Sequence, residues 1–266
     1  MIEDAKSKFE RAKNEITNRF KSLLKKDNIS TKDFDKIISD ISTIASMELA
    51  EYIAYRQQII LALESMNKNN EKKEKNIHNI FMQMRSESRG EDYEAYANNL
   101  WLFDDKYMTY IYAASDIEIE KYKQALQEIA DDYNSKYRPD LTVFFSNKGN
   151  HKKDAIIVEF KSCGASIDEK SKSFWEINRN AQAIREDFNN DIERMWCYTI
   201  TKFDSKFKKN IESQDFQPLF TNGKNKELYY QYFTNINAHC YYISLEALLS
   251  DAKARNTVFL DLIRQK

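Results

Sequence analysis

The chain has 266 residues, of which 42% are hydrophobic and 31% charged, with only four glycines and two prolines. This composition is typical of a helix-rich globular protein and excludes a disordered chain. The 41 basic and 42 acidic side chains give a formal net charge of −1. A protein that coats nucleic acid is usually strongly basic, so any nucleic acid would have to be held by a local patch.

The predicted location of the protein follows from its apolar runs and its cysteines. No apolar run approaches the about 20 residues that cross a bilayer, and the N-terminus lacks the apolar core of a signal peptide. Cys163, Cys197 and Cys240 have the spacing of neither a disulfide framework nor a zinc site. We therefore expect no membrane partner and a reducing, cytoplasmic location. We interpret Cys163 as a small buried residue and not as a nucleophile.

The N-terminal third is expected to be helical, because no glycine or proline precedes Gly90. Apolar residues recur at steps of three and four from Phe9 to Leu24 and from Phe34 to Ile60. The two helices would pair as a hairpin, and we assign residues 1–68 to this hairpin or connector and residues 69–266 to a second domain. Their surplus apolar face fits a plain scaffold or an interface with a partner or a second copy.

The middle of the chain is expected to change from helix to strand. The polar stretch 67–75 begins or interrupts a third helix, which would end near residue 84 with Glu74 and His78 on one face. After Gly90, the aromatic-rich residues 100–103 and 106–113 predict two strands joined at residues 104–105. Residues 117–137 return to a helical pattern.

Residues 138–145 and 154–161 predict an antiparallel hairpin around a polar loop that contains Gly149. Paired positions in such a ladder sum to a constant, so Asp140 would lie opposite Glu159, with Cβ atoms roughly 4.5–5.5 Å apart. Lys161 would point to the same face as Glu159, and the residues at positions 156, 158 and 160 to the other.

Two opposed carboxylates weaken a sheet unless a cation lies between them. Mg²⁺ or Mn²⁺ suits that position, because both are hard cations that bind carboxylate, carbonyl and water oxygens. A neighbouring lysine could orient a water molecule or stabilise a developing oxyanion. The alternative is that Glu159 and Lys161 are strand-end residues in water, whose ion pair contributes almost nothing to stability.

The C-terminal half predicts a helix over residues 168–190, a central strand over 195–201, strands over 228–233 and 241–243, and a closing helix over 245–263. The order of helix, strands, helix and strand predicts an α/β sandwich. We interpret the tyrosines of the tail as half-buried sheet residues; they are Tyr229, Tyr230, Tyr232, Tyr241 and Tyr242.

Pro139-Asp140 followed by Glu159-Phe160-Lys161 resembles the signature of the PD-(D/E)xK nuclease superfamily. Further matches resemble the nuclease-like region found C-terminal to GHKL-type ATPase domains in bacterial proteins, some of them associated with defence. They lie at residues 99–102, 104, 115–116, 138 and 251–256, with a helical connector at residues 49–56. The resemblance covers roughly residues 49 to 262. It implies a restriction-endonuclease-like mixed sheet, flanked by helices and preceded by the helical hairpin.

The resemblance implies a divalent-metal-dependent phosphodiesterase, most readily a DNA endonuclease, which could be the nuclease part of an antiviral defence system. Asp140, Glu159 and the backbone carbonyl of Phe160 would hold Mg²⁺ or Mn²⁺, and Lys161 would position or help deprotonate the attacking water. Glu74 matches a third acid from the helix before the sheet, and Gln182 a glutamine that reaches back from the following helix. For both, the alternative is a solvated helix residue.

Candidate nucleic-acid contacts are loop lysines, for which simple solvation is the alternative. Phe203 and Phe207 lie among the second group of lysines and could stack on bases. The lysines are Lys148, Lys152 and Lys153 in the hairpin loop, and Lys202, Lys206, Lys208 and Lys209 after the central strand.

The resemblance further implies an ATPase partner, either separate or fused, although no ATPase precedes the nuclease-like region in this chain. Two competing functions remain open. The chain could be a catalytically inactive module with the nuclease fold that binds nucleic acid or a protein partner. Alternatively, the Glu-x-Lys motif could be a coincidence in a structural helical protein with an added sheet.

Overall fold

The computed structural model describes residues 31–90, 96–126, 136–146, 152–188, 191–219 and 227–264, together with some positions between 11 and 22. The chain divides into two compact units, one of Met1–Arg56 with Val258–Lys266 and one of Gln57–Thr257. The unit boundaries fall inside the helices α2 (Thr31–Lys68) and α7 (Leu245–Arg264). The domain boundary after residue 68 stays a prediction.

The first unit is helical where it is described. The described positions between 11 and 22 are helical, and Lys13 pairs with Glu48 of α2; the rest of the predicted first helix lies outside the described residues. The guanidinium of the buried Arg56 lies 5.6 Å from the ring centroid of Tyr52 and 5.7 Å from that of Phe259. None of the helices that the structure describes is long and apolar enough to span a membrane.

In its described residues, the second unit is built on a mixed sheet of eight strands in the order β1-β2-β3-β4-β5-β8-β7-β6. Neighbouring strands from β1 to β4 are antiparallel, and β4, β5 and β8 are parallel. β7 is antiparallel to β8, and β6 is antiparallel to β7. The predicted α/β class with a mixed, helix-flanked sheet is confirmed. The strands are β1 Ser86–Arg89, β2 Tyr112–Ser115, β3 Leu141–Ser146, β4 Lys153–Phe160, β5 Ile192–Thr201, β6 Gln217–Pro218, β7 Leu228–Phe233 and β8 Ala238–Ser244.

The β3–β4 hairpin has the predicted register. Leu141 pairs with Val158 and Ser146 with Lys153, so the same ladder extended by one position sets residue 140 opposite residue 159. Alternate residues of β4 enter different cores: Ile156, Val158 and Phe160 one, Ala155 and Ile157 the other. The predicted division of the two faces is therefore confirmed.

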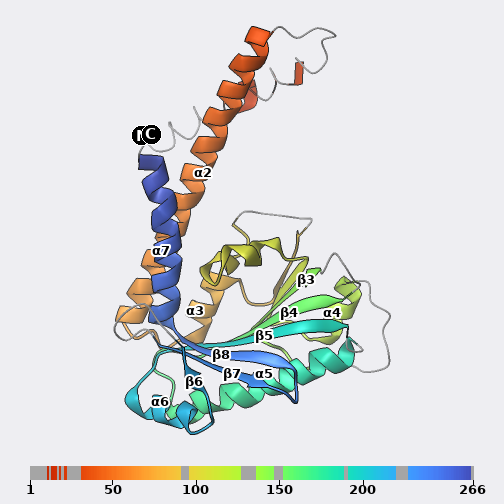
Figure 1. Cartoon of the computed structure of the whole chain (residues 1–266), viewed down its shortest axis with the longest axis vertical. Helices are drawn as coiled ribbons and strands as arrows, with labels where there is room; N and C mark the ends of the chain where they lie inside the picture. Colours follow the sequence, from red (N-terminus) through yellow and green to blue (C-terminus); the bar gives the residue numbers. More distant parts are fainter. Residues whose placement is uncertain are drawn as a thin grey trace. The chain divides into compact units, whose positions relative to one another are not determined.

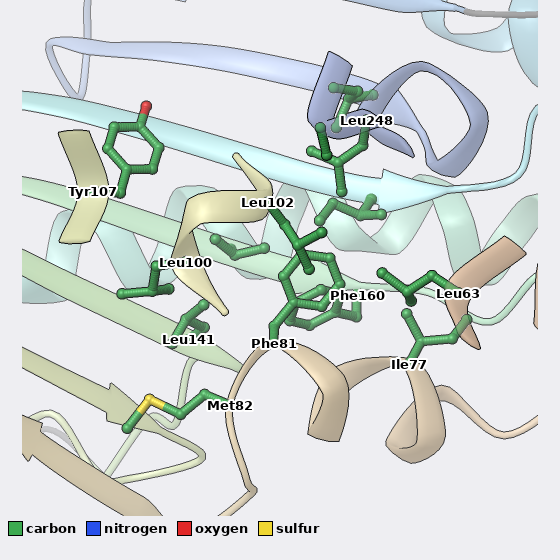
Figure 2. Close-up of a cluster of buried hydrophobic side chains, with 14 of the residues drawn as sticks. Leu63, Ile77, Phe81, Met82, Leu100, Leu102, Tyr107, Leu141, Phe160 and Leu248 are labelled. Atoms are coloured by element: carbon green, nitrogen blue, oxygen red, sulfur yellow. The ribbon is translucent and has the colours of Figure 1, made fainter. Parts of the chain in front are cut away.

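Helices cover both faces of the sheet. The core with Ala155 and Ile157 contains residues of α4 (Glu120–Ala125), α5 (Ile167–Asp187) and α6 (Ser205–Glu212), and α5 runs along this face (Figure 1). The core with Phe160 contains α3 (Glu74–Phe81), two 3-10 helices (η2, Leu100–Leu102, and η3, Asp105–Thr109) and the start of α7. Figure 2 shows Phe81 of α3 beside Phe160.

The two strands predicted over residues 100–103 and 106–113 are wrong, because most of this segment forms η2 and η3. Local side-chain hydrogen bonds favour these turns over an extended chain. The Asn99 amide accepts a hydrogen bond from Trp101 Nε1 and donates one to the backbone of Ile80, and the Asp104 side chain accepts one from the Lys106 amide. Of the residues in these two predicted strands, only Tyr112 and Ala113 belong to a strand, β2 (Tyr112–Ser115).

Other boundaries differ from the predictions less. The helix predicted over residues 117–137 begins at Glu120 and is described to Ala125, and residues 127–135 lie outside the described part. The polar strand β1, Ser86–Arg89, and the helix α6 were not predicted. The predicted central strand, the strands of the tail and the closing helix are present as β5, β7, β8 and α7.

Candidate active site

The start of β3 and the end of β4 bring Asp140 and Glu159 together. Asp140 directly precedes β3, and Glu159 is the penultimate residue of β4. Asp140 Oδ2 accepts a hydrogen bond of 2.7 Å from the backbone amide of Phe160. Because this bond ties the Asp140 carboxylate to the residue after Glu159, the two acids lie beside one another at one end of the hairpin.

The ammonium group of Lys161 lies between two carboxylates. Lys161 Nζ donates to Glu159 Oε1 at 2.6 Å and forms an ion pair with Glu176 Oε2 at 3.0 Å. Burial works against the charged lysine, but Glu159 and the neighbouring acids outweigh it and raise the pKa of Lys161. Lys161 is therefore a permanent cation at neutral pH.

The acids of this cluster differ in how readily they ionise. Burial, followed by the charges of nearby acids, raises the pKa of Asp140 to about 7 and that of Glu159 well above its ordinary value. Burial also raises the pKa of Glu74. For Glu176, burial acts in the same direction, but Lys161 outweighs it and lowers the pKa. One lysine thus faces more acids than it can neutralise, and protons remain on the most buried ones.

Glu74, at the first position of α3, lies at this cluster, and its role as a third acid stays a prediction. The charges of Lys161 and Glu176 both act on its pKa, and the backbone of Ser162 bonds to its carboxylate. Its side chain is partly exposed, so it stands at the solvent side of the cluster.

No sequence pattern predicted that Glu176 of α5 would join this cluster. A capping box of Ser166 and Glu169 begins α5, and Ile177, Ala181 and Ile184 form its buried side. Glu176 flanks that side, and its Oε2 atom lies 3.0 Å from Lys161 Nζ. In the sequence, its position next to the apolar stripe of a predicted helix was the one signal that could have indicated a partly buried acid.

The structure does not bring Gln182 to the cluster. Six residues after Glu176, it lies about 240° further round the helix, at 100° per residue. Its side chain is exposed and donates to Glu186 Oε1 at 2.8 Å. Its role near a metal stays a prediction that this geometry does not favour.

His78, on the same helix as Glu74, supports the end of β4. Its Nε2 lies 2.8 Å from Ser115 Oγ, and its ring stacks on Phe160 with centroids 5.0 Å apart. Burial lowers the pKa of His78 to about 4, so the ring is neutral at pH 7. It fixes Phe160 and, through it, the charged residues on either side.

The predicted lysine cluster on and before α6 has partners within the fold. Lys202 donates to Asn70 Oδ1 at 2.6 Å and Lys208 pairs with Glu227, whereas Lys206 and Lys209 are exposed. The prediction that Phe207 stacks on bases is wrong, because its side chain is fully buried. Phe203 stacks on Tyr229 instead. Lys148 lies outside the described residues.

The donor chemistry of the cluster, several carboxylates, suits a hard divalent cation. Within the described part of the chain, however, no group of three or more His, Cys, Asp or Glu side chains forms a ready metal site. Instead, the Lys161 ammonium lies between the carboxylates of Glu159 and Glu176 and pairs with both. Comparison of the chain with protein-family models, curated proteins and solved structures gave no match.

Proposed function

We propose that the chain is a divalent-metal-dependent phosphodiesterase that cleaves nucleic acid, most readily DNA, with the restriction-endonuclease-like fold. One observation carries the proposal. Asp140 and Glu159 meet at the end of an antiparallel hairpin, and the ammonium of Lys161 lies 2.6 Å from Glu159. This is the residue set, on the element order, that the resemblance to the PD-(D/E)xK nucleases implies.

In this proposal Asp140, Glu159 and the carbonyl oxygen of Phe160 hold Mg²⁺ or Mn²⁺. When bound, the ion would offset charge on the phosphate and lower the pKa of a water molecule. Lys161 remains protonated, so it orients the attacking water and stabilises negative charge on the phosphate oxygens without acting as the base. Glu176 holds the Lys161 ammonium in place, and Glu74 lies at the solvent side.

The elevated pKa values of Asp140 and Glu159 support a cation at this position. Two neighbouring buried acids retain protons when no cation compensates them, and a divalent ion would replace those protons. The ion would also have to draw the carboxylates into one coordination shell, since they do not form a ready site with Lys161 between Glu159 and Glu176.

The test is plasmid nicking with Mg²⁺ or Mn²⁺ by purified wild type, Asp140→Asn and Lys161→Met. Asp187→Asn is a matched control, because Asp187 is also a buried acid with a raised pKa but lies at the far end of α5 beside Lys123. We expect each site variant to lose several orders of magnitude in rate, as with other groups that act as a unit, and the control to stay active. Undiminished cleavage by either site variant would refute the assignment.

A second candidate function is a binding module without hydrolysis. The near-neutral net charge of the chain, −1, favours it. A wild type that binds oligonucleotides but cleaves none, in either metal, would establish this alternative over the enzyme.

A further inference from the structure

An exposed tryptophan lies next to the candidate active site. Trp175 directly precedes Glu176 on α5, and with 70% of its surface exposed it is the most exposed large hydrophobic side chain that the structure describes. One edge of it contacts Phe174, with ring centroids 5.4 Å apart. A single exposed apolar residue is common on protein surfaces, so its neighbours decide whether it has a role.

Two neighbours of Trp175 on the helix surface are cationic. Lys172 and Arg179 lie three residues before and four residues after it, which places all three on one strip of α5. Glu176 borders this strip on the side of the buried residues. The acids at the start of the helix offset part of this charge, although the Glu169 carboxylate accepts the Ser166 amide in the capping box.

The strip continues across to the segment that carries Asp140. The guanidinium of Arg179 lies over the ring of Tyr137, 4.3 Å from its centroid. Tyr137 is three residues before Asp140, and 43% of its surface is exposed. The aromatic and cationic side chains therefore follow the two segments that supply Asp140 and Glu176.

We propose that Lys172, Trp175, Arg179 and Tyr137 form a stacking strip for single-stranded nucleic acid. Trp175 stacks on an unpaired base, and Lys172 and Arg179 bind the phosphates on either side. The next phosphodiester then lies at the carboxylate cluster. A base inside a duplex has no free face for an outward-pointing ring, whereas an unpaired base does. The inference rests on the proposed function and names its substrate class.

The test measures binding without cleavage, in EDTA, by anisotropy of a labelled single-stranded oligonucleotide and of a blunt duplex of the same sequence. Stacking on an aromatic side chain contributes about 1–3 kcal/mol per base, so Trp175→Ala should weaken single-strand binding about 5- to 150-fold. Trp175→Phe should restore part of the loss. Tyr232→Ala is the control, because Tyr232 is an aromatic residue on β7 with 42% of its surface exposed, and it should bind as wild type does.

The salt dependence of binding separates the phosphate contacts from the stacking contact. Lys172→Ala and Arg179→Ala should each reduce the slope of log affinity against log salt by about 1, the contribution of one phosphate contact, whereas Trp175→Ala should leave it unchanged. A base stacked on Trp175 should also quench its fluorescence. The quenching can be assigned to Trp175 because Trp101 is fully buried and Trp196 is half-buried.

The outcomes distinguish this inference from the proposed function. Equal single-strand affinity of wild type and Trp175→Ala, or tighter wild-type binding of the duplex, would overturn the stacking strip even if plasmid is nicked. If Trp175→Ala weakens binding while Asp140→Asn cleaves normally, the strip stands and the assignment of the catalytic residues fails.

Discussion

Replacing His78 with glutamine should change how the stability of the protein depends on pH. The imidazole is buried, bonds Ser115 and stacks on Phe160. Protonating it inside the fold is unfavourable, because the charge would lose its hydration among apolar neighbours. Glutamine keeps a polar group at this position but does not titrate.

The magnitude follows from the pKa of His78, which burial lowers from 6.5 to about 4. Between these two pH values the His78 side chain is protonated in the unfolded chain but not in the folded chain. The contribution of the neutral imidazole to stability is therefore present above pH 6.5 and is lost as the pH falls to 4. At 1.36 kcal/mol per pKa unit the loss is about 3 kcal/mol. Asp140 and Glu159 have raised pKa values and act in the opposite direction on acidification, so only a comparison of variants isolates His78.

Urea unfolding followed by circular dichroism at a series of pH values measures this difference. The free energy of unfolding of the wild type minus that of His78→Gln should fall by about 3 kcal/mol between pH 7 and pH 4. Ser115→Ala removes the hydrogen-bond partner but keeps the ring, and it should retain most of the wild-type pH dependence. A difference between wild type and His78→Gln that is constant with pH would refute the reasoning.

Three further perturbations test the site and the fold. Mg²⁺ or Mn²⁺ at about 100 times its dissociation constant should stabilise the wild type by about 2.7 kcal/mol and leave Asp140→Asn unchanged in calorimetry; an unshifted wild type would contradict a metal site. Lys161→Met should lower the free energy of unfolding by about 3–5 kcal/mol at pH 8, because it leaves buried carboxylates without their cation. The loss should be smaller at pH 5, where those acids hold protons, and equal losses at the two pH values in urea unfolding would count against the ion cluster. Gly90→Ala should destabilise the protein, since its Cβ would lie 2.1 Å from the Tyr110 carbonyl oxygen, whereas Gly164→Ala meets nothing nearer than 3.7 Å; thermal unfolding of the two variants should differ accordingly.

The hairpin that carries Asp140 and Glu159 could be predicted because its determinants are local. Two β-branched runs around a short polar loop fix the register, and the register fixes which side chains oppose each other. Lys161 follows from the same alternation along β4. These three residues needed no information about the rest of the fold.

Glu176 could not be predicted, because its position depends on how α5 is rotated and translated against the sheet. Sequence periodicity identifies the buried side of a helix but not which bordering residue lies next to a strand end. The same limit explains Gln182, whose order in the chain fits the resemblance but whose side chain points to solvent. The strands predicted over residues 100–113 failed for another reason. The side chains of Asn99 and Asp104 accept hydrogen bonds that stabilise turns, and hydrophobicity alone does not reveal these bonds.

The two edges of the eight-stranded sheet are poor templates for adding another strand. On one side, β6 has only two residues, and Pro218 lacks an amide hydrogen to donate. On the other, β1 is four residues long and carries Glu87 and Arg89. Short, charged or proline-containing borders discourage intermolecular β-pairing. Self-association of this protein would therefore proceed through helices and not by extension of the sheet. The exposed apolar side chains of Met47 and Leu49 on α2 offer such a contact.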